Sequence, residues 1–290
     1  MPGSNERKRR LARERYERQQ QRRRERQRKI QKWSVISLAV IAVLGLAGGL
    51  TAAFAGGSTP KHTTASKATP TASPSASATS STAAVTEPAK HCSYTSSSAG
   101  DVVKASLPPA TPDYKATYTA TINTSVGPIS INLLNSKATC TVNSFVHLAD
   151  ANFWNNTQCH RISNSEGLFM LQCGDPTAKA TQTLSCSSTT VGTGGPGYEF
   201  ANENLSGAKY PAGTVAMANS GGSDTNGSQF FLVFKNTSLP ADYTPFGTIT
   251  SGLDILQNVA KAGTSCTYPQ AGGGVPKEKV IIKSVTIKQV

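Results

Sequence analysis

An uncharged segment of 23 residues, Trp33–Ala55, separates a basic N-terminal tail from the rest of this 290-residue chain. As an α-helix the segment would extend about 35 Å, enough to cross a hydrocarbon core of about 30 Å. Residues 1–32 carry 14 Lys and Arg, whereas the first basic residue beyond the segment is Lys61. The positive-inside rule therefore predicts one transmembrane helix at 33–55, with residues 1–32 as a cytoplasmic tail and the remaining chain outside the cytoplasm.

Two other interpretations of the N-terminal region stay open. Ala53-Phe54-Ala55 fits a small-x-small cleavage site, so the segment could instead be a signal peptide removed near Ala55, which would leave the domain secreted. The Arg-rich tail could also neutralise the phosphates of a nucleic acid. The tail adjoins the predicted span, however, and its only aromatic residue is Tyr16. We interpret it as a topology signal that rests against anionic lipid, and we expect no nucleic-acid partner.

The composition changes again beyond the apolar segment. Residues 56–112 are rich in Ser, Thr, Ala and Pro and contain few large apolar side chains. Such a stretch buries too little surface to offset its ordering entropy, so we predict a disordered linker. The remaining residues, 113–290, have the length of one ordinary domain.

The pattern of the domain indicates a mainly β fold with two helices. Polar and apolar residues alternate over 118–123 and over 129–134 on either side of Gly127-Pro128, which predicts an antiparallel hairpin. Helical spacing follows at 142–149, with Thr139 or Thr141 as a candidate cap, and again at 251–262, where Gly263 would end the helix. Short strands are expected over 159–250 and a last strand at 279–288, an arrangement that favours a β-barrel flanked or capped by helices.

All six cysteines follow the predicted span, in a compartment that we expect to be oxidising, so structural disulfides are the first interpretation. Fifteen pairings are possible, and the sequence does not choose among them. Zinc binding is disfavoured because the cysteines lack metal-ligand spacing and no His-x3–5-His accompanies them, and we expect neither a metal nor a cofactor. The candidates for disulfides are Cys92, Cys140, Cys159, Cys173, Cys186 and Cys266.

Three segments of the domain carry a more specific signal. They are Cys159-His160-Arg161-Ile162, the run FMLQCGD at 169–175, and AMANS at 216–220, which continues into TNGSQFF at 225–231. In this order, and with GTGG at 192–195, they resemble the active-site segments of the cyclophilins, which are peptidyl-prolyl cis-trans isomerases. The resemblance covers about 117–290 and implies an eight-stranded antiparallel β-barrel closed by two α-helices. With the predicted anchor, the chain is similar to membrane-anchored bacterial forms.

The chemistry that such a site must perform is rotation about the X-Pro peptide bond. The barrier is about 18–20 kcal/mol because rotation breaks amide resonance, and no nucleophile or metal is needed. A fixed cation with forked donors, Arg161, can hydrogen-bond the proline nitrogen, whose lone pair is available only in the twisted state. The resemblance implies that Gln172 positions the guanidinium. His160 adjoins the arginine, but rotation requires no base, so we expect His160 to pack or hydrogen-bond.

The resemblance also implies a proline socket and contacts to the substrate backbone. Each of these residues has a structural alternative, which is core packing for the apolar ones and a turn for Asn219. The predicted catalytic residues are Arg161, Gln172, His160 and Phe169, and the predicted substrate-binding residues are Met170, Ala218, Asn219, Ser220, Gln229, Phe231, Leu239 and Tyr243.

The chain departs from the family pattern on one side of the predicted pocket. Ser238 stands where many cyclophilins have a Trp, and Tyr243 stands where they have a pocket His. Cys173 replaces a Gly, and about ten extra residues follow Asp175. These changes put substrate preference and the binding of cyclosporin-type ligands in doubt more than isomerisation.

Two functions are compatible with these observations. The first is an isomerase that acts on exported or cell-surface proteins, with proline-containing polypeptides as its partners. The alternative is a chaperone or scaffold that binds proline-containing segments with little turnover. The enzyme is favoured by four intact residues, Arg161, Phe169, Gln172 and Phe231. The sequence leaves the oligomeric state open.

Overall fold

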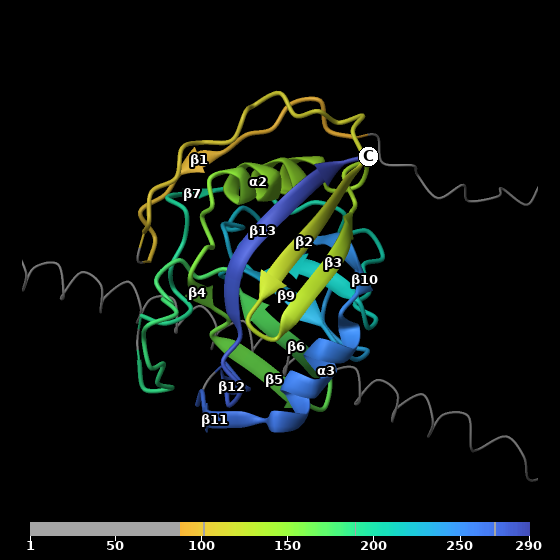
Figure 1. The fold of residues 1–290 in the computed structure, drawn as a ribbon. Coiled ribbons are helices and arrows are strands. Elements are labelled where there is room, and N and C mark those ends of the chain that lie inside the picture. The colour runs from red at the N-terminus through yellow and green to blue at the C-terminus, as the bar shows by residue number, and fades with distance from the viewer. Residues whose placement is uncertain (1–87, 101, 189, 270) are drawn as a thin grey trace, which may run out of the picture. The chain divides into compact units, whose positions relative to one another are not determined.

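The computed structural model describes residues 88–290 except for 101, 189 and 270 (Figure 1). The predicted tail, the predicted span at 33–55 and residues 56–87 of the predicted linker lie outside this range. Within the described range, no helix combines the length and the apolar character that a membrane crossing requires.

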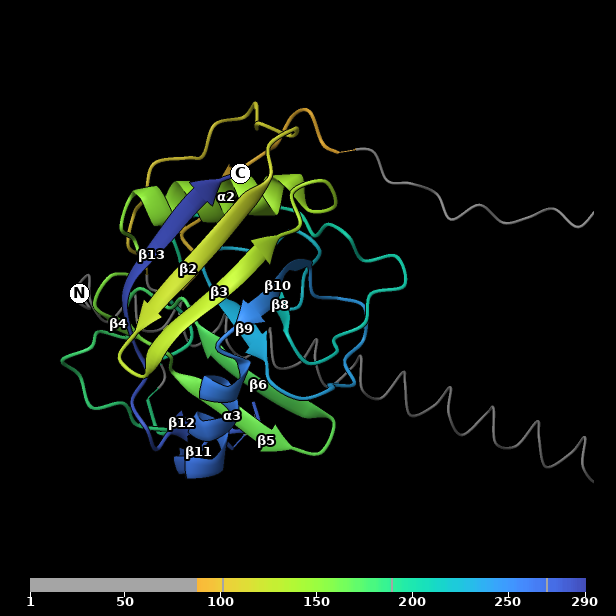
Figure 2. The ribbon, with the colours of Figure 1, turned by 45° about the vertical axis from the view of Figure 1, so that its right-hand side comes forward.

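The domain is built on one antiparallel sheet (Figures 1 and 2). A separate two-stranded ladder joins β1 (Thr95–Ser96) to β7 (Tyr198–Glu199). The strands of the main sheet, in hydrogen-bonded order, are β11 (Thr264–Thr267), β12 (Gly274–Pro276), β5 (Arg161–Ser165), β6 (Leu168–Cys173), β9 (Phe230–Val233), β8 (Thr214–Met217), β10 (Pro245–Ser251), β3 (Gly127–Leu133), β2 (Tyr118–Thr124), β13 (Ile281–Gln289) and β4 (Thr157–Gln158).

The mainly β architecture with two helices is confirmed, whereas the implied eight-stranded closed barrel is not found as such. The described part of the main sheet contains eleven strands, and no ladder joins β11 to β4. Short strands account for much of the difference, since β4 and β12 have only two and three residues.

The predicted hairpin is present as β2 and β3. Ile122 lies opposite Ile129, and Ala120 lies opposite Ile131. All four side chains are buried in the core, as the alternation of polar and apolar residues requires. The last strand, β13, pairs along β2.

Both predicted helices are present, as α2 (Thr139–Asp150) and α3 (Leu253–Ala262), and Gly263 ends α3 with φ 79°. The predicted cap of α2 is wrong, because neither threonine accepts a bond from the first turn. The carboxylate of Glu203 caps the helix instead, accepting bonds from the N–H groups of Cys140 at 3.0 Å and Thr141 at 2.7 Å. A negative charge at this end also complements the helix dipole.

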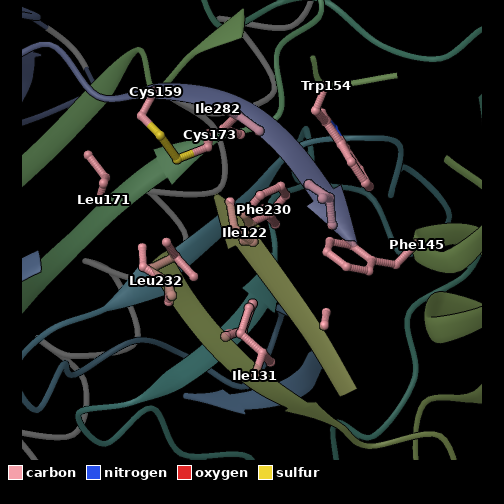
Figure 3. Close-up of a cluster of buried hydrophobic side chains, with 14 of the residues drawn as sticks. Ile122, Ile131, Phe145, Trp154, Cys159, Leu171, Cys173, Phe230, Leu232 and Ile282 are labelled. Atoms are coloured by element: carbon pink, nitrogen blue, oxygen red, sulfur yellow. A yellow bond between two sulfur atoms is a disulfide. The ribbon is translucent and has the colours of Figure 1, made fainter. Parts of the chain in front are cut away.

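Buried side chains of the main sheet, of α2 and of α3 form the core, part of which is drawn in Figure 3. Phe145 of α2 packs against Trp154, with ring centroids 4.8 Å apart, and against Phe230 of β9 at 5.7 Å. The indole N–H of Trp154 donates to the carbonyl of Ser228, so burying this large ring leaves no unpaired donor.

The predicted linker extends too far toward the C-terminus. Within the described part of this segment, Cys92 is disulfide-bonded to Cys140, and Tyr94 and Ala105 pack against the core. The Tyr94 hydroxyl donates to the carbonyl of Cys140 at 2.8 Å. The composition of this segment is polar, so hydrophobic burial contributes little to ordering it. A disulfide and backbone hydrogen bonds stabilise it instead.

Candidate active site

Arg161 and Gln172 lie directly opposite each other on β5 and β6. The guanidinium Nη1 donates to Gln172 Oε1 at 3.0 Å. Because opposed residues of neighbouring strands share a face, the register of this ladder is enough to bring the two side chains together. The resemblance to the cyclophilins implied that Gln172 positions the guanidinium of Arg161, and this hydrogen bond is compatible with that role.

Two backbone carbonyls hold the other side of the guanidinium. Arg161 Nε donates to the carbonyl of Gly272 at 2.9 Å, and Nη2 donates to the carbonyl of Ala271. Both carbonyls belong to the loop between β11 and β12. Partial burial lowers the pKa of Arg161, while the nearby Tyr243 and Tyr268 act in the opposite direction. An arginine remains charged under such a shift, so the site retains a fixed cation.

A second glutamine continues the network away from Arg161. Gln172 Nε2 donates to Gln229 Oε1 at 3.0 Å. Gln229 Nε2 in turn donates to the carbonyls of Gly192 at 3.1 Å and Gly194 at 2.8 Å. The amide orientations of both glutamines are therefore determined by their partners, which leaves Gln172 Oε1 to accept from the arginine.

One row of side chains extends from Arg161 across four strands. The ladders place Arg161 opposite Gln172, Gln172 opposite Phe231, and Phe231 opposite Ala216. The adjacent row places Ile162, Leu171, Leu232 and Val215 opposite one another, and these side chains are buried in the main core. Neighbouring residues of a strand point to opposite faces, so the row with Arg161 lies on the face away from that core.

An apolar cluster covers this outer face beside the arginine. Its buried members are Met170, Tyr210, Ala216, Phe231 and Val233, and Leu168, Ala208, Ala218, Leu239 and Tyr243 pack against them. Five of the predicted substrate-binding residues, Met170, Ala218, Phe231, Leu239 and Tyr243, are therefore brought together. The Tyr243 ring lies 5.7 Å from the Phe231 ring, edge to face.

Asn219 and Ser220 begin the loop that follows β8. Asn219 Nδ2 donates to the carbonyl of Asp242 at 2.7 Å, and its Oδ1 accepts from the N–H of Gly221 at 3.0 Å. The N–H of Ser220 donates to the Thr225 hydroxyl. The Asn219 side chain thus stabilises a turn, which was the structural alternative for this residue.

The structure does not bring Phe169 or His160 into the outer cluster. Phe169 alternates with Met170 along β6 and packs against the main core instead, with Lys235 Nζ 4.6 Å from its ring centroid. His160 is buried, and neither ring nitrogen has a hydrogen-bond partner in the described residues. The catalytic roles that the resemblance implies for Phe169 and His160 therefore stay predictions, since neither residue belongs to the cluster beside Arg161.

All six cysteines form disulfides, which confirms the prediction. The pairs are Cys92–Cys140, Cys159–Cys173 and Cys186–Cys266. The second pair flanks the site, because Cys173 directly follows Gln172 and Cys159 lies two residues before Arg161 (Figure 3). The third pair joins the segment after Asp175 to β11, next to the loop that holds Arg161.

Comparison with known families decides the assignment. Residues 119–287 match the family described as cyclophilin type peptidyl-prolyl cis-trans isomerase/CLD. The chain belongs to the cyclophilin family. The match covers more than half of the chain and contains every residue of the outer cluster.

Named relatives of this cyclophilin include proteins called probable peptidyl-prolyl cis-trans isomerase B. The one from Mycobacterium leprae is 41% identical over 215 residues, which are 68% of this chain and 66% of that protein. The one from Mycobacterium tuberculosis H37Rv is 40% identical over 215 residues, which are 68% of this chain and 64% of that protein. The chain thus spans just under two thirds of these relatives. Peptidyl-prolyl cis-trans isomerase-like 3 of Dictyostelium discoideum is 36% identical over 172 residues, 93% of its length.

Several features of this cyclophilin site had no sequence signal. Arg161 donates to the carbonyls of Ala271 and Gly272, which are about 110 residues away in the sequence. The Tyr268 hydroxyl, from the same region of the chain, donates to the carbonyl of His160 at 3.0 Å. Carbonyl groups are common to all residues, so only the fold could show which ones meet the guanidinium. The structure also locates Ser238, which replaces the Trp of many cyclophilins: this residue is exposed, and its N–H donates to the carbonyl of Gly167.

Proposed function

We propose that this protein is a peptidyl-prolyl cis-trans isomerase in which Arg161 stabilises the twisted X-Pro amide. The observation that carries the proposal is the row formed by Arg161, Gln172 and Phe231, which places a fixed cation beside an apolar cluster on one face of the sheet. A proline ring requires an apolar contact, and its nitrogen requires a donor only when resonance is lost.

The hydrogen bonds of Arg161 leave donors available for that role. A guanidinium has five N–H donors. One from each of its three nitrogens is used by Gln172, Gly272 and Ala271. One N–H on Nη1 and one on Nη2 therefore remain for a substrate. The three fixed contacts hold the guanidinium plane before a substrate arrives, so less reorganisation is needed in the transition state.

The apolar cluster would bind the proline ring, and the loop after β8 would contact the substrate backbone. Met170, Phe231 and Leu239 supply apolar surface next to Arg161. The Asn219 side chain is engaged in its turn, which leaves its backbone groups for a substrate. The apolar cluster and the loop would thus bind the substrate in its ground state, whereas Arg161 would contact the proline nitrogen only in the transition state.

The Arg161→Ala variant of the full-length chain tests this function. A charge-assisted donor aimed at the transition state contributes about 2.7–4 kcal/mol, so we expect turnover of a proline peptide to fall by about 10² to 10³. Turnover is measured in a protease-coupled isomerisation assay, and circular dichroism checks that the variant is folded. Unchanged turnover in a folded variant would remove Arg161 from the mechanism. If the wild type binds the peptide without turnover, the alternative function is favoured, which is a chaperone or scaffold that binds proline-containing segments.

We further propose that the domain lies outside the cytoplasm, tethered by a transmembrane helix at 33–55, and acts on exported or cell-surface polypeptides. The proposal is supported by the charge asymmetry around this segment and by the three disulfides, which persist in oxidising compartments. Secretion after cleavage near Ala55 is the alternative.

A further inference from the structure

Residues 92–112 without 101, here called the N-terminal strap, precede the region that matches the family. In Figures 1 and 2 the strap, drawn orange to yellow, runs along the outer side of α2. Its two ends meet, because the N–H of Cys92 donates to the carbonyl of Ala110 at 2.7 Å. The Cys92–Cys140 disulfide and a bond from Asn143 Nδ2 to the carbonyl of Pro109 at 2.8 Å fasten both ends to α2.

The middle of the strap holds one loop of the domain, residues 192–197, here called the glycine loop. The N–H of Ser97 donates to the carbonyl of Gly197 at 2.8 Å, the N–H of Val103 to that of Gly195 at 3.1 Å, and the N–H of Ala105 to that of Pro196 at 2.9 Å. Because the strap passes the loop at 97 and again at 103–105, it bonds three successive carbonyls of the loop.

Close packing accompanies these bonds. Gly100 of the strap has φ +77°, and a Cβ added there would come within 2.0 Å of the carbonyl oxygen of Thr193. On the inner side of the loop, a Cβ added to Gly194 would come within 2.1 Å of Asp175 Oδ1. The glycine loop is therefore confined between the strap and the turn at Asp175, with no room for either neighbour to approach further.

The same glycine loop supplies the carbonyls at the far end of the active-site network. Gly192 and Gly194 accept from Gln229, Gln229 accepts from Gln172, and Gln172 accepts from Arg161. A displacement of the loop would be transmitted to the guanidinium, because each amide in the series is oriented by the next. A misplacement of about 1 Å in a catalytic group can cost about 10² in rate.

We propose that the N-terminal strap is a positioning element of the isomerase site, which holds the glycine loop so that Gln229 and Gln172 keep Arg161 in its productive orientation. The inference rests on the proposed isomerase function. The strap touches no member of the apolar cluster through these bonds, so it acts on the orientation of the guanidinium and not on the binding of the proline ring.

Proline substitutions that remove strap N–H donors provide the test. Val103→Pro/Ala105→Pro in the full-length chain removes two bonds to the glycine loop and leaves the disulfide intact. Lys104→Pro is the matched control, because the intervening N–H has no acceptor in the described residues. We expect kcat for a proline peptide to fall about tenfold in the double variant, equivalent to about 1.4 kcal/mol, with KM within about twofold of wild type. The control should retain the wild-type kcat.

A second pair of variants tests the same proposal if the double proline variant does not fold. Gly100→Ala pushes against Thr193, whereas Gly207→Ala has a similar positive φ of +65° with no atom within 4 Å of its Cβ. We expect only Gly100→Ala to lower kcat and to shift the NMR signals of the Arg161 Nε–H and the Gln172 and Gln229 side-chain amides. Equal effects of the two variants, or unshifted signals with unchanged kcat, would overturn the strap proposal. An inactive wild type would instead overturn the proposed function.

Discussion

His160 illustrates how much the surroundings of a single residue decide. Its ring is buried next to Gly192, and a Cβ added to that glycine would lie 3.4 Å from Cδ2 and Nε2 of the ring. Burial lowers the pKa of His160 to about 4, Asp175 acts to raise this pKa, and Arg161 acts to lower it further. The imidazole is therefore neutral at physiological pH and does not add a second charge beside the guanidinium.

This lowered pKa predicts a pH dependence of stability. An unfolded His titrates near 6.5, so the neutral buried ring contributes its full stability above about pH 6.5 and loses it as the pH falls toward 4. Between pH 7 and 4.5, the free energy of unfolding should fall by about 2–3 kcal/mol more in the wild type than in His160→Leu. Urea denaturation of both proteins at the two pH values measures the difference. Parallel losses would show that His160 does not carry this term.

At the scale of the elements, one disulfide reinforces a pair of neighbouring strands, and the other two join segments that no strand ladder connects. Cys159–Cys173 links the start of β5 to the end of β6, on either side of the Arg161–Gln172 pair. Cys186–Cys266 closes a separation of 80 residues and ties the segment after Asp175 to the β11 strand. Cys92–Cys140 does the same for the strap and α2. The first two links therefore lie next to the groups that hold Arg161, and the third fastens the strap.

These pairings can be checked directly. Thiol titration of the unfolded, unreduced protein from its native compartment should find no free thiols, and peptide mapping should recover the three pairs described above. Reduction should lower the melting temperature, since losing a native disulfide costs a small domain about 2–5 kcal/mol. Six titratable thiols, or a different set of linked peptides, would contradict the pairing.

For the whole molecule, the proposed membrane tether would determine where the proposed isomerase acts. If residues 33–55 span the membrane, the full chain should stay with membranes after carbonate washing. A C-terminal alkaline phosphatase fusion, which is active only outside the cytoplasm, should also be active. Mass analysis should find residues 1–32 still attached. Release of a chain that begins near residue 56 would establish the cleaved, secreted alternative, and an inactive fusion would contradict the proposed orientation.

The amino-acid sequence by itself determined the features that depend on neighbouring residues. Alternation predicted the β2–β3 hairpin, and helical spacing predicted α2 and α3. These succeed because strand and helix periods repeat within a few residues. That Arg161, Gln172 and Phe231 lie in one row was implied by the resemblance to the cyclophilins and not by periodicity.

Only the tertiary structure decided which distant groups meet. It selected one of fifteen cysteine pairings, capped α2 with Glu203, and brought the carbonyls of Ala271 and Gly272 to Arg161. It also showed that the strap, polar enough to be predicted as disordered, packs against the glycine loop. The physical reason is that backbone carbonyls, N–H groups and thiols carry no mark of their partner in the local sequence, so the path of the chain alone selects it.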